Sequence, residues 1–167
     1  MKWMHQSRKE EEERKMLNEI CLDLNNFFDK GLPKFNGDFI IDSGKITDTD
    51  FLDVIKENQY FRIVGSIFND GVYKYTDDLE LTDEAFHGSI WLMAIPAEFL
   101  SLAAEIEAWQ AKNGSVDSAA MSPFYSESFG GYSYSKSAGS VSGAGASTTW
   151  QNAYKNRLNI YRRIKGI

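Results

Sequence analysis

The sequence is poor in the residues that most often carry out chemistry. Its 167 residues include one cysteine and two histidines. A single cysteine cannot form a disulfide within the chain, and a Cys/His metal cluster would need ligands that the chain lacks. Cys21 falls on an apolar helical face, which predicts a buried structural thiol. His5 lies in a polar run and His87 in a predicted turn, so neither indicates a metal ligand or a catalytic base.

Long apolar runs and an excess of positive charge are also lacking. No stretch approaches the 18 apolar residues of a membrane span, and residues 1–15 lack the apolar segment of a secretory signal. We therefore expect no membrane partner. Aspartate and glutamate number 24 against 18 lysines and arginines, which gives a net charge of −6. An acidic chain is a poor scaffold for gripping phosphates, because tight nucleic-acid binding needs clustered Lys and Arg.

Two further motifs fail as catalytic or cofactor sites. The carboxylates of residues 77–84 lack the spacing and the turn glycine of a cation-binding loop, so we expect a solvated acidic loop. The glycine pair at 130–131 lacks the surrounding pattern of a phosphate-binding loop. The sequence thus predicts no catalytic residues, no metal, no cofactor and no enzymatic activity.

What the chain has is aromatic residues, with 11 Phe, 8 Tyr and 4 Trp. The first group of aromatic residues lies on the apolar faces of two predicted helices. Residues 6–30 predict a long helix, polar through the charge run at 8–15 and then apolar at three- and four-residue spacing. A glycine and a proline at 31 and 33 are expected to end it. Residues 96–112 predict a second helix, with the proline at its first position and Trp109 on its core face.

Between these helices the spacing of apolar residues changes to the alternation that is typical of strands. Residues 60–68 and 72–76 flank Asn69, Asp70 and Gly71, and an Asp-Gly pair between such runs is a strong hairpin-turn signal. A continuous apolar run at 88–95 has the length of a strand. Residues 35–95 therefore predict a small antiparallel β-module.

The C-terminal part has a different character. Residues 126–136 alternate serine with aromatic residues, and residues 137–148 are a Ser/Gly/Ala run of the kind that makes flexible linkers. Residues 150–165 predict a basic aromatic helix. The fold class is therefore α+β: a helical body (1–125) with a β-module inserted after the first long helix, and an extended assembly arm (126–167) that ends in a short helix.

The arm is rich in the residues that dominate interface cores, and its alternating segment suits a strand that pairs at an edge, on this chain or another. Alternatively, the terminal helix packs on its own domain. The predicted interface residues are Phe129, Tyr132, Tyr134, Trp150, Tyr154, Arg157, Tyr161, Arg162 and Arg163.

Four segments in this order carry a resemblance to a known family. They are QYFRIVGSIFNDGVYKY (59–75), FHGSIWLMAIP (86–96), SPFYSESFGGYSYSK (122–136) and the closing W-Q-x-A-Y-x-x-R-L-x-x-Y-R-R-I (150–164). Together they resemble small proteins of tailed phages and prophages of Gram-positive bacteria, which look like head–tail connector or adaptor proteins. The resemblance covers about residues 17–167 and leaves out the charge run at 8–15.

The resemblance implies a structural role in the virion, with assembly in the host cytoplasm. Such adaptors form a ring, usually of twelve copies, below the portal of the capsid. They extend the DNA channel, through which DNA only passes, and present a platform for the stopper or tail proteins. The better-known adaptors are mostly helical, and this chain departs from them by its β-module.

Two other functions remain open at the level of sequence. One is a stopper or tail-completion protein of the same phage neck, whose β-module would meet the tail tube. The other belongs to a different class, a small monomeric protein-binding module that regulates a partner.

Overall fold

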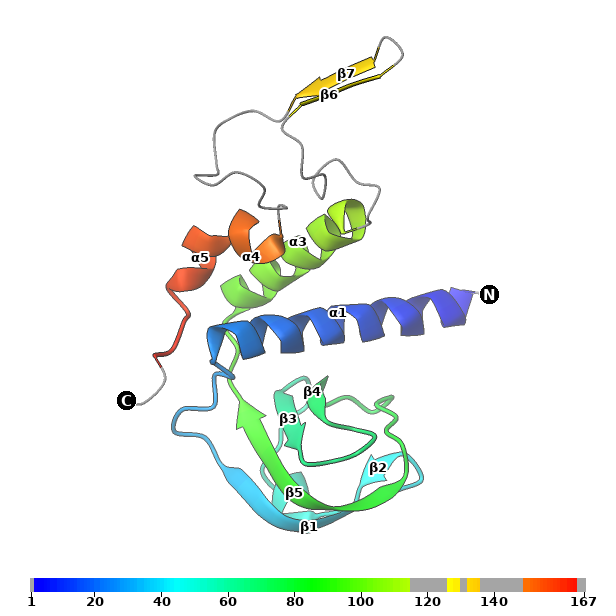
Figure 1. Cartoon of the computed structure of the whole chain (residues 1–167). Coiled ribbons are helices and arrows are strands. Elements are labelled where there is room, and N and C mark those ends of the chain that lie inside the picture. Colours follow the sequence, from blue (N-terminus) through cyan, green and yellow to red (C-terminus); the bar gives the residue numbers. More distant parts are fainter. Residues whose placement is uncertain (1, 115–125, 130–131, 136–148, 165–167) are drawn as a thin grey trace. The chain divides into compact units, whose positions relative to one another are not determined.

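The fold comes from a computed structural model of the chain (Figure 1). It describes residues 2–114, 126–129, 132–135 and 149–164, and the side chains of residues 8–114 and 149–164. The chain forms two compact units, one of Met1–Ala103 with Tyr161–Ile167 and one of Ala104–Ile160. The chain leaves the first unit after Ala103 and returns to it at Tyr161, and the expected division at 125/126 stays a prediction.

The first unit begins with α1 (Lys2–Leu24). Ion pairs four residues apart line its exposed face, at Arg8–Glu12, Lys9–Glu13 and Glu11–Lys15. Each contributes little to stability, because both partners are solvated. The end of the helix buries the apolar stripe of Met16, Leu17, Ile20, Cys21 and Leu24.

The predicted C-terminal end of this helix, at residue 30, is wrong. α1 ends at Leu24, and Asn25 and Phe28 have positive φ angles of 51° and 53°. This left-handed conformation cannot continue a right-handed helix. The Asn26 carboxamide oxygen accepts the Phe28 N–H at 3.0 Å and fixes the turn. Phe27 and Phe28 keep the apolar spacing although they lie beyond the helix.

The β-module is one antiparallel sheet in the order β2-β1-β5-β3-β4. Its strands are β1 (Lys34–Asp42), β2 (Lys45–Ile46), β3 (Tyr60–Val64), β4 (Gly71–Lys74) and β5 (Glu84–Met93). With the helices, this sheet confirms the predicted α+β class.

The pairing register gives the module two ends. Lys34 of β1 faces Trp91 near the end of β5, whereas Ile41 faces Glu84 at its start. β3 runs in the same direction as β1, since both pair antiparallel to β5. We call the end where β1 and β3 begin the Lys34 end, and the end where β5 begins the Glu84 end (Figure 1).

The inner face of the sheet holds an aromatic and aliphatic core. β3 shows the alternation of a half-buried strand, with Phe61 and Ile63 buried. A short helix, α2 (Thr49–Leu52), adds the fully buried Phe51, and the Asp48 carboxylate caps it by accepting the Phe51 N–H at 2.8 Å. The cluster comprises Phe39, Ile41, Ile46, Phe51, Ile55, Phe61, Ile63, Tyr73, Leu81, Phe86, Ile90 and Leu92.

Two glycines shape the Glu84 end. A Cβ at Gly88 would collide with the Val64 carbonyl oxygen, so β3 and β5 approach there only because Gly88 has no side chain. Gly65 has a φ of +91°, and a Cβ on it would lie 3.0 Å from the His87 carbonyl oxygen. β3 therefore ends at Val64 and not at residue 68 as the alternation predicts.

The hairpin turn and the position of His87 also differ from expectation. Asn69 and Asp70 belong to a six-residue connection, residues 65–70, and Gly71 is the first residue of β4. The predicted hairpin forms, and its connection is longer than the predicted turn residues Asn69, Asp70 and Gly71. His87 lies within β5, directly opposite Asp38 of β1, and not in a turn.

α3 (Ala97–Asn113) follows the module and begins directly after Pro96. The Pro96 carbonyl accepts the N–H groups of Phe99 and Leu100 at 3.0 and 3.1 Å, so the proline precedes the first helical residue. The helix buries Phe99, Leu102, Ala103 and Ile106, whereas Trp109 is half-buried.

The second unit contains the later turns of α3, the hairpin of β6 (Ser126–Phe129) and β7 (Tyr132–Ser135), and the helices α4 (Trp150–Ala153) and α5 (Lys155–Asn159). The two halves of the expected extended segment thus pair with each other. A single helix over 150–165 is wrong, because Tyr154 breaks it with φ −109° and ψ 10°.

Candidate functional site

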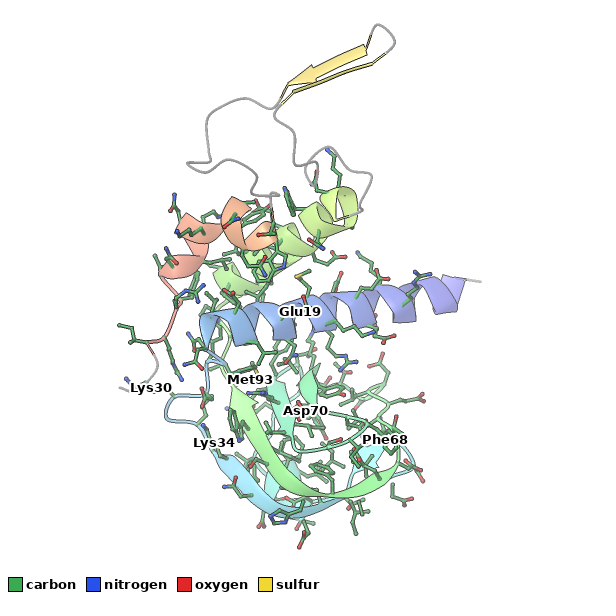
Figure 2. The ribbon with its side chains drawn as sticks, in the orientation of Figure 1. Glu19, Lys30, Lys34, Phe68, Asp70 and Met93 are labelled. Atoms are coloured by element: carbon green, nitrogen blue, oxygen red, sulfur yellow. The ribbon has the colours of Figure 1, made fainter. Side chains whose placement is uncertain are left out.

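The 65–70 connection at the Glu84 end presents two apolar side chains to solvent. Ile67 is 84% exposed and Phe68 is 66% exposed, in a unit whose other large apolar side chains are mostly buried. Contiguous apolar surface, unlike single exposed apolar residues, is a feature of interaction sites. Ile67 and Phe68 are called the apolar tip below, and Figure 2 labels Phe68.

Hydrogen bonds brace the backbone on both sides of the apolar tip. The Ser66 hydroxyl donates to the Glu84 carboxylate and accepts the Asn69 N–H at 2.6 Å. The Asn69 amide donates to the Thr82 carbonyl at 2.9 Å and to Glu84 at 2.7 Å, and its oxygen accepts the Thr82 N–H at 2.8 Å. Asn69 is only 2% exposed, so these bonds are shielded from water.

Glu84 and Asp70 complete the brace from opposite sides. Partial burial raises the pKa of Glu84, but the hydrogen bonds from Ser66, Asn69 and the backbone of the tip outweigh it and hold that pKa below its ordinary value. The Asp70 carboxylate accepts the Gly65 N–H at 2.8 Å. The backbone on both sides of the tip is therefore fixed by hydrogen bonds, which lowers the backbone entropy that binding through the tip would cost.

At the Lys34 end the surface is hollowed. Leu32, Pro33 and Leu92 supply apolar walls, and the segment before β3 supplies Val54 and residues 56–59. The hollow is open to solvent and has a volume of about 430 Å³. Val54 is 43% exposed, so an apolar group is available to a partner there.

Both ends carry charges of both signs. Asp70 and Asp83 are exposed at the Glu84 end, where the Lys45 ammonium donates to the Asp77 and Leu79 carbonyls. The Arg14 guanidinium lies over the Tyr73 ring beside this end, and Arg62 interacts electrostatically with Asp70. Around the hollow lie the cations Lys30, Lys34, Lys56 and Arg163 and the anions Asp29 and Glu57.

Of the predicted interface residues at 150–157, Tyr154 and Arg157 have partners within the second unit, and Trp150 is buried. Trp150 is only 6% exposed. The Tyr154 ring stands edge-on to the Trp109 ring at 6.4 Å, and Arg157 pairs with Glu105 at 2.7 Å.

The remaining predicted interface residues of this region lie in the first unit. The Tyr161 ring contacts the Phe99 ring at 4.9 Å. Arg162 pairs with Asp23 at 2.6 Å, and Arg163 pairs with Asp29 at 2.9 Å. The Arg163 N–H also donates to the carbonyl of Leu24 at 3.0 Å, next to the end of α1.

The other three predicted interface residues are Phe129, Tyr132 and Tyr134. Their backbones belong to the β6–β7 pair, in which Phe129 faces Tyr132. Their side chains lie outside the part of the chain whose side chains the structure describes, so their role as contacts stays a prediction.

The titratable groups of the described part do not converge on a reaction centre. Burial raises the pKa of Cys21 to about 12, which makes its thiol inert at neutral pH. The His87 ring lies 2.8 Å from the Asp38 carboxylate, but both side chains are largely exposed. Among the side chains that the structure describes, no three His, Cys, Asp or Glu residues are placed to hold a metal ion together.

One carboxylate of the predicted acidic loop, residues 77–84, has a role that the sequence did not predict. Glu84 lies in β5 and supports the apolar tip, whereas the others remain on the connection before the strand. The sequence missed the tip because residues 60–68 alternate like a strand. The Gly65-Ser66 and Asn69-Asp70 pairs on both sides of it are the signal that could have identified a loop.

Comparisons with known proteins leave this site to be judged on its own geometry. No family model matches the chain, no curated protein is significantly similar to it, and no solved structure matches its fold. In the part that the structure describes, no helix combines the length and apolar character needed to cross a bilayer.

Proposed function

We propose that the chain is a structural virion protein, a head–tail connector subunit that forms a ring below the portal and joins the capsid to the stopper or tail. One structural observation supports it most: a braced loop holds the exposed apolar tip, an arrangement suited to protein contact. The resemblance of the four sequence segments supports the choice of this class among contact proteins.

The charge of the chain agrees with a channel that DNA passes through. A net charge of −6 disfavours the retention of phosphates, so in this proposal DNA passes as cargo. The partners in this proposal are the portal protein, the stopper or tail proteins, and further copies of the chain. The subunit assembles in the host cytoplasm and is located in the virion neck.

Mass measurement with and without the portal protein tests this function. We expect a ring of subunits, twelve in the simplest case, formed alone or on the portal. A chain that stays monomeric and does not associate with the portal would contradict the proposal. The stopper would bind an assembled portal–adaptor ring but not the portal alone, so the same measurement separates these two functions.

A monomeric protein-binding module is the second candidate, and one observation favours it. The basic aromatic residues that a connector arm would offer to neighbours are paired within the chain, as Arg162 with Asp23 and Arg163 with Asp29. A monomer at every concentration that binds a host protein through the apolar tip would identify this function instead.

A further inference from the structure

We propose that the C-terminal end of α1 carries a preformed recognition site for an aromatic residue followed by two arginines, and that residues 161–163 are a releasable strap that fills it. Figure 1 shows the strap, in red, beside the end of α1. The strap and its site both belong to the first unit. The site goes beyond the connector function and does not depend on it.

The first observation concerns the carbonyl groups that end α1. The last four carbonyls of a helix have no partner within the helix. Two of them accept N–H groups from the turn that follows α1. The other two, those of Asp23 and Leu24, accept from the Arg162 guanidinium at 2.6 Å and from the Arg163 N–H at 3.0 Å. Because α1 has no basic residue in its own last turn, the strap supplies the cations that the negative end of the helix dipole favours.

The second observation is that the contacts fit these residue types. The carbonyl of Tyr161 accepts from the Asn26 amide at 2.8 Å, which holds the backbone of the strap. The guanidinium of Arg162 forks over one residue, since its second nitrogen meets the Asp23 carboxylate at 2.6 Å. A lysine ammonium has no such planar fork. The site therefore selects arginine and not positive charge alone.

The third observation is that the groups of the site have further contacts that do not involve the strap. Asp29, the partner of the second arginine, also pairs with Lys34 at 2.5 Å. The Asn26 carboxamide oxygen accepts the Phe28 N–H, and the Phe28 ring contacts the Phe99 ring at 4.6 Å. Groups held in this way stay in place when the strap leaves, and a preorganised site favours binding.

The fourth observation is that the strap itself is weakly attached. It belongs to no helix or strand, and the side chains of Arg162 and Arg163 are 45% and 37% exposed. Ion pairs this exposed contribute little net free energy and are weakened by salt. A segment with few buried contacts opens at a lower free energy than the core does. The strap thus combines specific contacts with easy release.

Binding of the strap as a separate peptide tests the site. The full chain with Tyr161→Ala, Arg162→Ala and Arg163→Ala is the emptied variant, and the probe is a fluorescent peptide of residues 159–164, NIYRRI. Fluorescence anisotropy should show binding to the emptied variant. Binding to the wild-type chain should be at least about ten-fold weaker, because the tethered strap competes at a high effective concentration.

Two matched controls separate recognition from simple charge attraction. The same peptide with lysine in place of both arginines keeps the charge but loses the fork, so it should bind about ten-fold more weakly. Asp23→Asn, added to the emptied variant, should weaken binding of the arginine peptide. Asp42→Asn, on the exposed side of β1, should leave that binding unchanged.

Three results would overturn the recognition site. They are no binding of the arginine peptide to the emptied variant at about millimolar concentration, equal binding to the emptied variant and the wild-type chain, and equal binding of the lysine and arginine peptides.

Hydrogen exchange in the wild-type chain gives a second readout that does not depend on the folding of a variant. The Arg163 N–H should exchange at least about 100-fold faster than the N–H of Leu92, which is bonded to the Pro33 carbonyl beside the core of the sheet. Its rate should rise with salt, whereas that of Leu92 should not. An Arg163 N–H as protected as that of Leu92 at every salt concentration would show that the strap is not releasable.

Discussion

The apolar tip and the C-terminal segment 149–164 place the side chains that suit an interface in opposite environments. The C-terminal segment has the residues typical of interfaces, yet Trp150 is buried and Arg162 and Arg163 are paired within the chain. The tip has only an isoleucine and a phenylalanine, yet a rigid brace holds both in solvent. Residue type alone therefore does not identify a contact surface, because what decides is whether the chain itself supplies the partner.

The largest effect should come from removing the buried core of the C-terminal segment. Leu158 is 1% exposed, so Leu158→Ala should leave a cavity and lower the free energy of unfolding by about 2–5 kcal/mol. Ile160→Ala, two residues away and 77% exposed, should change it by less than about 0.5 kcal/mol. Denaturant unfolding of both variants checks this. Equal effects would show that the segment is not a packed part of the fold.

The brace of the apolar tip comes next in size. Asn69→Ala leaves the Thr82 backbone groups and the Glu84 carboxylate without their shielded partner, at an expected cost of about 1–3 kcal/mol in unfolding free energy. Asn36→Ala on the exposed face of β1 is the matched control. Hydrogen exchange should also be faster at the N–H of Thr82 and unchanged by the control. If Asn69→Ala is as stable as the wild-type chain and hydrogen exchange at the Thr82 N–H is unchanged, Asn69 does not brace the apolar tip.

A smaller effect follows from pH, through the anchor of the C-terminal segment. Burial raises the pKa of Asp29, but Lys34, the backbone and Arg163 outweigh it and lower that pKa below the ordinary 3.8. The unfolded chain thus binds a proton more readily, so the stabilisation is complete above pH 3.8 and is lost as the pH falls through the folded-state value. We expect Asp29→Asn to flatten the acid limb of a thermal-unfolding series. The exposed Asp38→Asn is its control, and an acid limb equally steep in all three proteins would contradict the role of Asp29.

The smallest effect should come from the apolar tip itself. The double variant Ile67→Ser and Phe68→Ser removes apolar surface that the fold does not bury, so the unfolding free energy should change by no more than about 0.5 kcal/mol. Thermal unfolding at low protein concentration measures this. A loss above 2 kcal/mol, roughly, would mean that the tip packs within the chain, and the contrast with the C-terminal segment would disappear.

The sequence predicts those elements whose signal is local. The apolar spacing of 16–24 and the alternation of 60–64 follow from burial on one face, and both elements form. The same periods continue too far, through Phe28 in the first case and Phe68 in the second. What ends each element is a backbone conformation with positive φ, at Asn25 and at Gly65, that periodicity does not report.

The contacts of the candidate site depend on residues distant in sequence. Arg162 meets Asp23 and Arg163 meets Asp29, more than a hundred residues away. No local pattern connects such positions. The sequence could therefore indicate interface-type residues at the C-terminus, but not the residues with which they pair. The brace of the apolar tip is similar, because Asn69 and Glu84 carry no signal that they belong together.

The bonds of residue 163 have a consequence for the covalent continuity of the chain. Because the chain leaves the first unit after Ala103 and rejoins it at Tyr161, residues 104–160 are topologically an insertion. The first unit is therefore built from two separate stretches of chain, and the contacts of Arg163 with Leu24 and Asp29 join the second stretch to the first.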